Sequence, residues 1–139
     1  MASVDWLGKI LDGLAANLST ITGLRVFETV PSSLPTGPVA VIGLPEEIEY
    51  DMTFGGGNAD VYLPIRLYLP MVSEQSAQRT LHPYLAPTGA QSINAAVETD
   101  PTLGGAASSL HLQKAYKFGV YQIGQGQMLG VEFRVWVVA

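Results

Sequence analysis

The chain of 139 residues has no cysteine and no long apolar run. The missing cysteine excludes disulfides, thiolate catalysis and cysteine-bound zinc, and slightly favours folding inside the cell. Without a run of about 18 apolar residues, we expect no membrane-spanning helix. The first residues also lack the basic-then-apolar pattern of a signal peptide.

Charge is scarce as well. Charged residues make up 14% of the chain, against about 25% in a typical soluble domain. Apolar residues make up 47%, a composition that excludes a disordered chain. In a domain of this size, so few charges imply either that partners cover part of the surface or that the exterior is unusually neutral.

Basic residues are outnumbered by acidic ones, seven to twelve, and the net charge is −5. This argues against nucleic-acid backbones and anionic membranes as main partners, because both attract clustered Lys and Arg. The acids are unevenly placed, since eight of the twelve precede residue 71. Four of these fall within six residues, namely Glu46, Glu47, Glu49 and Asp51.

The length predicts one domain that covers residues 1–139. Apolar spacing predicts a helix from about Asp5 to Asn17 or Ser19, capped by Ser3 or Asp5. Further elements are expected, in chain order, at 24–30 (extended), 39–44 (inner strand), 60–69 (strand), 73–82 (helix), 92–98 (short helix), 108–118 (strand) and 128–139 (strand). Hairpins and short links favour an α+β architecture. It has an antiparallel or mixed β-sheet, with the N-terminal helix and two central helices packed on one face.

Prolines and glycines mark the expected breaks between these elements. Pro31–Pro38 predicts a loop of fixed shape, and Glu46–Asn58 predicts a long exposed loop or a pair of strand ends with a glycine-rich tip. Pro64 favours an edge strand or a bulge, because proline cannot donate to a ladder. Pro83 is expected to end or kink its helix, and Gly119–Gln127 to form a hairpin connection.

The sequence predicts no catalytic, cofactor or metal site. His82 and His111 are its only histidines; the first precedes a proline at a helix end, and the second is expected to point away from the core. The glycine runs at Gly55–Gly57 and Gly124–Gly130 lack the Lys-Ser/Thr pair and the following helix of a phosphate-binding loop. In both runs, we interpret the glycines as residues that allow a turn of the backbone.

The acidic segment comprises Glu46, Glu47, Glu49, Asp51 and Asp60. Oxygen ligands of this kind could hold a hard cation, but the spacing lacks the calcium-loop pattern. Two interpretations stay open: a solvated acidic face, or a negatively charged surface that repels or guides a partner.

A second group of residues falls on the outward faces of the predicted strands. It consists of Tyr62, Arg66, Tyr68, Arg134 and Trp136. Aromatic and Arg side chains are enriched at the buried centres of protein interfaces. The residues therefore predict a subunit interface, with a second core under the helices as the equal alternative.

Short phrases across the chain resemble one protein family. Residues 81–105 read LHPYLAPTGAQSINAAVETDPTLGG, a helix end, a turn, a short helix and an Asp-x-Thr-Leu-Gly-Gly link. Around them stand an N-terminal amphipathic helix leading into ITGLRVFETVPSSLP, a PVAVIGLP strand, and a closing GVEFRVWV strand. This arrangement resembles the small tail-terminator and head–tail joining proteins of long-tailed bacteriophages.

The resemblance implies a protein without enzymatic activity that needs no cofactor. Members of the family form a ring, commonly hexameric, on the end of the tail tube. The implied partners are further copies of the chain, the major tail tube protein and a head-completion or connector protein. DNA passes through the lumen without specific binding, and the ring is assembled in the host cytoplasm and resides at the head–tail junction of the virion. The acidic segment would then face the lumen or the neighbouring tube ring.

Two alternatives remain. One is another ring of the same connector, such as the head-closure or adaptor component. The other is a small α+β enzyme or ligand-binding domain, which would need polar groups converging in an apolar pocket. The predicted inward faces are almost wholly apolar, which disfavours this second alternative.

Overall fold

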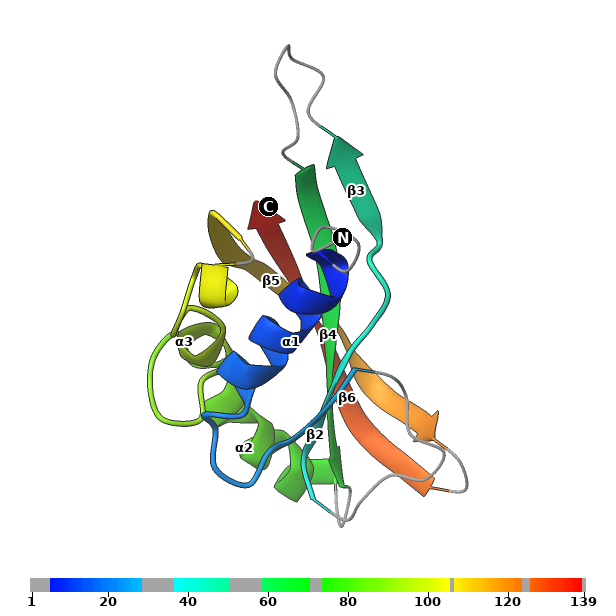
Figure 1. Ribbon diagram of the computed structural model, residues 1–139. Helices are drawn as coiled ribbons and strands as arrows, with labels where there is room; N and C mark the ends of the chain where they lie inside the picture. Colours follow the sequence, from blue (N-terminus) through cyan, green and yellow to red (C-terminus); the bar gives the residue numbers. More distant parts are fainter. Residues whose placement is uncertain are drawn as a thin grey trace.

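The computed structural model describes residues 6–28, 37–50, 59–70, 74–105, 107–123 and 126–138. Within these residues the chain is an α+β domain, as predicted, with a mixed six-stranded sheet and its helices on one side (Figure 1). The elements are, in order, α1 (Trp6–Leu18), β1 (Arg25–Phe27), β2 (Val39–Ile42), β3 (Glu47–Tyr50), β4 (Ala59–Pro70), α2 (Glu74–Leu85), α3 (Ile93–Val97), the 3-10 turn η2 (Leu103–Gly105), β5 (Ser109–Ile123) and β6 (Gly126–Val138).

The sheet has the strand order β1-β2-β4-β6-β5, and β3 also pairs with β4. Only β1 and β2 pair in parallel among the described strands; the other pairs are antiparallel. Because β2 pairs with the second half of β4 and β3 with its first four residues, the two ends of the sheet differ. At one end the order is β3-β4-β6-β5, and Figure 1 shows this end rising beyond the body of the domain.

Helix α1 packs on the sheet through the apolar stripe expected from its sequence. Ile10, Leu14 and Leu18 are fully buried, and Leu7 and Leu11 are partly buried beside them. The predicted caps, Ser3 and Asp5, lie outside the described residues.

A buried side chain joins α1 to the segment around α3. The amide of Asn17, 5% exposed, donates to the carbonyl oxygens of Val97 at 2.9 Å and Asp100 at 3.0 Å. Helix α3 itself begins at the Ser92 cap, whose hydroxyl accepts from the backbone N–H of Ala95. These bonds fix α1 and α3 relative to each other over the sheet.

One face of the sheet forms the core, and we call it the helix face. Strands β4 and β6 alternate strictly, so every second side chain of each points toward the helices. These side chains are aliphatic or aromatic and at most 6% exposed: Val61, Leu63, Ile65, Leu67, Leu69, Leu129, Val131, Phe133, Val135 and Val137. Burial of this apolar surface is the main stabilising contribution to the fold.

The structure corrects the prediction for Pro64. Strand β4 lies inside the sheet, between β2 or β3 on one side and β6 on the other, so Pro64 is not on an edge strand. The segment that pairs with this side of β4 leaves the ladder opposite Pro64, between the end of β2 and the start of β3. There the backbone N–H of Gly43 donates to the Pro64 carbonyl at 3.0 Å. An interruption of the partner strand, rather than of β4, accommodates the missing N–H.

Two further boundaries differ from the sequence prediction. Helix α2 continues through Pro83 to Leu85 instead of ending near His82. Ser73, with which the predicted helix begins and which could cap it, lies outside the described residues. Most of Gly119–Gln127, predicted as a connection, is strand. Register shifts after Leu112 and after Tyr116 let β5 follow β6 to this length, and such bulges hide the simple alternation on which the prediction depended.

Candidate functional site

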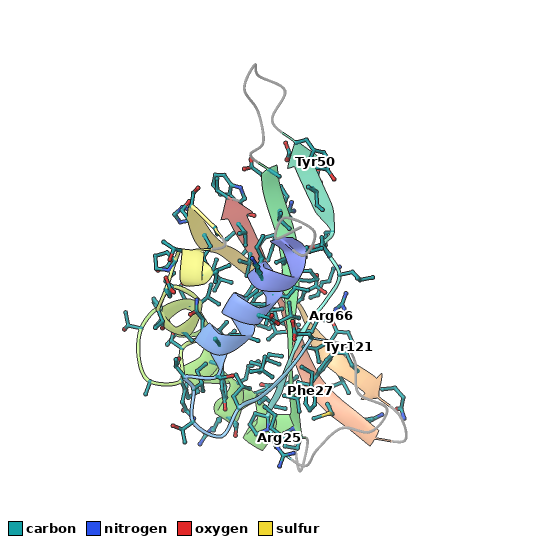
Figure 2. All side chains as sticks on the ribbon, viewed as in Figure 1. Arg25, Phe27, Tyr50, Arg66 and Tyr121 are labelled. Atoms are coloured by element: carbon teal, nitrogen blue, oxygen red, sulfur yellow. The ribbon has the colours of Figure 1, made fainter. Side chains whose placement is uncertain are left out.

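The face of the sheet opposite the helices is the candidate functional site, and we call it the outer face. None of the described helices packs on it. Figure 2 shows Arg66 on this side, away from α1. From β4 and β6 it presents Asp60, Tyr62, Arg66, Tyr68, Glu132, Arg134 and Trp136. The predicted interface residues thus lie on one surface, and they differ in their contacts and in their burial.

A row of three adjacent rings, which we call the ring row, crosses three strands of this face. Tyr62, Trp136 and His111 are cross-strand neighbours on β4, β6 and β5. The Tyr62 and Trp136 rings are stacked at 6.5 Å between centroids, and His111 lies 5.6 Å from Trp136. The Arg134 guanidinium lies 4.5 Å from the Tyr62 ring centroid, a cation–π contact.

Two donors in this row lack an acceptor. The indole N–H of Trp136 and the Nε–H of Arg134 are buried and have no hydrogen-bond partner among the described residues. A buried donor without an acceptor costs about 1–3 kcal/mol. The outer face therefore contains donors that a carbonyl or carboxylate from another molecule could satisfy.

A polar network lies next to the row, centred on Glu132, which is only 5% exposed. Arg66 Nε donates to Glu132 Oε1 at 3.1 Å, and the Tyr116 hydroxyl donates to Oε2 at 2.8 Å. Lys117 Nζ lies 3.6 Å from the same Oε2. A carboxylate on an uncovered sheet face is thus shielded by its own partners from β4 and β5.

These contacts alter the titration of the network. Burial pushes the pKa of Glu132 upward, but hydrogen bonds from Tyr116 and Arg66 and the charges of Arg66 and Lys117 outweigh burial, so that its pKa lies below the usual value. Burial, with the hydrogen bond to Glu132 and the carboxylate charges, raises the pKa of Tyr116 to about 12. The network is therefore charged and intact at neutral pH.

Sequence reasoning missed this network. The alternation of residues 129–137 puts Glu132 on the same face as Arg134 and Trp136, and its charge, opposite to that of Arg66, was the available signal. Tyr116 and Lys117 could not be placed from the sequence, because the bulge after Tyr116 changes which side chains face outward. Lys117 itself has a φ of 58°, a left-handed conformation uncommon for a residue with a side chain.

The acidic segment belongs to the outer face. Of its two predicted forms, the pair of strand ends is the one found, because β3 pairs with the start of β4. Glu46, Glu47 and Glu49 are exposed, and Asp60, half-buried, is the cross-strand partner of Glu49. Asp51 lies outside the described residues, as does the glycine-rich tip.

Two contacts and one electrostatic effect join the acids to the outer face. Glu47 lies 3.8 Å from Arg134, and the Tyr116 hydroxyl donates weakly to Glu46 at 3.4 Å. Burial and a hydrogen bond with Glu49 raise the pKa of Tyr62. The acidic segment and the ring row thus form one continuous surface.

Tyr68 requires a correction. It is only 8% exposed and belongs to a small apolar cluster on the outer face with Val39, Val41 and Met128. Its ring meets that of Tyr121 edge-on at 5.9 Å. Tyr68 is therefore covered by its own chain, in a small core on the face opposite the helices and not under them, and it offers little surface to another subunit.

The rest of the described chain has few features of a chemical site. His82 and His111 are both exposed, and no three His, Asp or Glu side chains of the described residues gather in a group that could hold a metal. A cavity of about 210 Å³ lies between α2, α3 and β5, with Tyr84, Leu112 and Phe133 in its lining. Its walls are mainly apolar side chains.

The comparisons with known proteins add no assignment. No protein-family model matches the sequence, and no curated protein matches it significantly. In the described part of the chain, no helix is both long and apolar enough to cross a membrane.

Proposed function

We propose that the chain is a structural subunit of a ring, hexameric in the family that it resembles, which caps the tail tube of a long-tailed bacteriophage. The ring stops polymerisation of the tube and joins it to the filled head. The observation that carries this proposal is the outer face, where half-buried aromatic and Arg side chains stand uncovered and a buried indole N–H has no acceptor among the described residues. The resemblance of residues 81–105 to tail-terminator and head–tail joining proteins supplies the biological setting.

A ring of identical subunits is a closed heterologous assembly, in which each copy presents two different complementary surfaces. The outer face, with Tyr62, Arg66, Arg134 and Trp136, provides contacts to neighbouring subunits. The major tail tube protein meets one side of the ring and a head-completion or connector protein meets the other. The ring is built in the host cytoplasm and remains at the head–tail junction of the virion.

The acidic residues would serve DNA passage. Glu46, Glu47, Glu49 and Asp60 give the β3–β4 end of the sheet a negative charge. In this proposal that end faces the lumen or the neighbouring tube ring. Like-charge repulsion there prevents DNA from sticking while it moves through. The net charge of −5 agrees with a channel that does not retain DNA.

The first experiment measures assembly. Light scattering after size-exclusion chromatography and native mass spectrometry, both at micromolar concentration, should give a closed ring for the wild-type chain. Trp136→Ala should shift the population toward monomer, whereas Arg79→Ala, an exposed residue of α2 on the other side of the molecule, should not. A strict monomer, both alone and with tail-tube protein, would overturn the proposal.

The second experiment separates termination from head closure. Electron microscopy of particles assembled without the protein should show overlong tails if the ring terminates the tube. Normal-length tails beside heads that leak DNA would instead assign the chain to the head-closure ring of the same connector.

A further inference from the structure

Two strands form opposite edges of the sheet at its β3–β4 end. The order there is β3-β4-β6-β5, and among the described residues no strand pairs with the outer side of β3 or of β5. Free strand edges are templates for pairing with another chain unless the protein blocks them. A side-by-side assembly of identical copies would bring β3 of one copy to β5 of the next.

The edge of β5 is blocked over much of its length. Register shifts follow Leu112 and Tyr116, and Lys117 adopts a left-handed conformation within the second shift. Only Ser109–Leu112 pairs regularly with β6 at the end of the sheet where β3 lies. That open stretch has four residues, the same number as β3.

The topology also fixes the relative direction of the two edges. Strand β3 is antiparallel to β4, β4 to β6, and β6 to β5. Strands β3 and β5 therefore run in opposite directions, and a neighbouring copy in the same orientation joins them as an antiparallel pair. This is the slightly more stable of the two ladder types.

The two edges are complementary on the outer face. Glu47 and Glu49 of β3 lie on this face because they pair with Tyr62 and Asp60. From β5, His111 and Lys114 lie on it as the partners of Trp136 and Arg134. All four side chains are exposed, so that an acidic edge would meet an edge that offers an ammonium group and an imidazole N–H.

The two edges, β3 and β5, are also complementary on the helix face. Ile48 and Tyr50 point to this side of β3; Ile48 is half-buried and Tyr50 is 68% exposed (Figure 2). On the same side of β5 stand Leu110 and the half-buried Leu112. An antiparallel pair that places Glu49 opposite His111 also places Ile48 opposite Leu112 and Tyr50 opposite Leu110. The exposed ring of Tyr50 and the partly exposed side chains of Ile48 and Leu112 would then be covered, whereas Leu110 is already buried.

We propose that β3 of one copy pairs antiparallel with Ser109–Leu112 of a second copy, with Glu49 opposite His111 and Glu47 near Lys114. The pairing continues the sheet from subunit to subunit and is a heterologous contact that helps to close the ring. Main-chain hydrogen bonds between the two strand edges supply affinity, and the facing side chains fix the register. The inference rests on the proposed ring, and it adds this edge contact to the contacts of the outer face.

Disulfide trapping tests this contact directly, because the chain has no cysteine of its own. The double variant Glu49→Cys, His111→Cys should yield a covalent ladder of oligomers after mild oxidation. Within one chain the two positions are three strand spacings apart, about 14 Å, and a disulfide needs Cα atoms within about 7 Å. Any bond formed is therefore between copies.

The single variants provide the control. Glu49→Cys and His111→Cys alone should give no covalent dimer, and a mixture of the two should give dimers only. A dimer from one single variant by itself would indicate a two-fold contact and overturn the proposal. A ring that forms normally while neither the double variant nor Glu47→Cys, Lys114→Cys is trapped would overturn the edge contact and leave the ring function standing. A chain that never assembles overturns both.

Charge exchange provides an independent readout. Glu47→Lys or Lys114→Glu should each raise the concentration needed for assembly by about tenfold, since each places like charges together. The two substitutions combined should restore assembly. Glu98→Lys, at an exposed position at the end of α3, is the matched control and should have no effect. Equal behaviour of all four variants would contradict the proposed contact.

Discussion

The two faces of strands β4 and β6 are built from alternate residues of the same strands, yet they differ in burial and in polarity. On the helix face, Leu63 and Val135 are fully buried and contact only apolar neighbours. On the outer face, Tyr62 and Trp136 are half-buried, and the indole N–H has no acceptor among the described residues. The helix face satisfies every requirement of folding within the chain. The outer face does not, which is what a surface shaped for another molecule would show.

The outer face is itself divided. Toward β1 and β2 it forms the apolar cluster of Tyr68, whereas toward β3 it bears the Glu132 network and the ring row. The first half is a small second core that completes the fold. The second half contains nearly all of the charge of this face. There we expect some substitutions to change assembly and others to change folding.

The largest expected loss of stability comes from a substitution on the helix face. Leu63→Ala should lower the free energy of unfolding by about 2–5 kcal/mol, because a fully buried side chain leaves a cavity. Its neighbour Tyr62→Ala should cost only about 1 kcal/mol in the monomer, the loss of one stacked pair and one cation–π contact. Urea unfolding at a concentration where the chain is monomeric measures both. Equal costs would show that the outer face is as tightly packed as the core.

The contrast between faces was largely predictable from the sequence. The strict alternation from Val61 to Leu69 and from Leu129 to Val137 identifies both strands and their buried sides. The stripe of α1 is equally clear, since Ile10, Leu14 and Leu18 repeat at helical spacing. The apolar periodicity shows which side chains avoid water, and this is sufficient to identify the residues of the helix face.

What periodicity does not report is how strands meet. The central position of Pro64 depends on where β2 leaves the sheet, and the length of β5 depends on two bulges. The burial of Tyr68 depends on Tyr121, which lies more than fifty residues away on β5. The unpaired indole of Trp136 follows from the exact packing of three rings, so the most informative part of the site could not be derived from the sequence.

The next effect concerns the charge on the outer face. Glu132→Gln should lower the free energy of unfolding by about 2 kcal/mol, because Arg66 loses a charge-assisted hydrogen bond. Partial exposure of Arg66 and Lys117 keeps the cost moderate. Urea unfolding at pH 7 gives this value.

The stability of Glu132→Gln at acidic pH provides a second test of the network. The pKa of Glu132 is lowered in the folded chain, so its carboxylate stabilises the fold above its unfolded pKa of about 4.3 and ceases to do so as pH falls through the lower folded value. The difference between wild type and Glu132→Gln should therefore shrink in acid. A difference that is constant down to pH 2 would contradict the assigned network.

A smaller effect separates the apolar half of the outer face from its neighbour. A Cβ added at Gly130 would lie 2.6 Å from the Tyr121 ring and 3.0 Å from that of Tyr68, so Gly130→Ala should cost about 1–2 kcal/mol. Its cross-strand partner Gly119 has open space around the same position. Gly119→Ala should be neutral or stabilising by up to about 1 kcal/mol. Thermal unfolding of the pair measures this, and similar losses in both would refute the close approach at Gly130.

The smallest effect lies at the alkaline end of the pH range. Tyr116→Phe removes one hydrogen bond to Glu132 and should cost about 1 kcal/mol at pH 7. The pKa of Tyr116 is raised to about 12 in the folded chain, against about 10 when unfolded. Its contribution is therefore complete below pH 10 and is lost as pH rises toward 12.

Denaturant unfolding across this interval should show the wild-type advantage over Tyr116→Phe disappearing. The alkaline decline persists in part in the variant, because the pKa values of Tyr62, Tyr68 and Tyr84 are also raised. Tyr84→Phe is the control from the helix side, where burial alone raises the pKa. If Tyr84→Phe flattened the decline and Tyr116→Phe did not, the helix side would govern the alkaline response, and the Glu132 network would have no part in it.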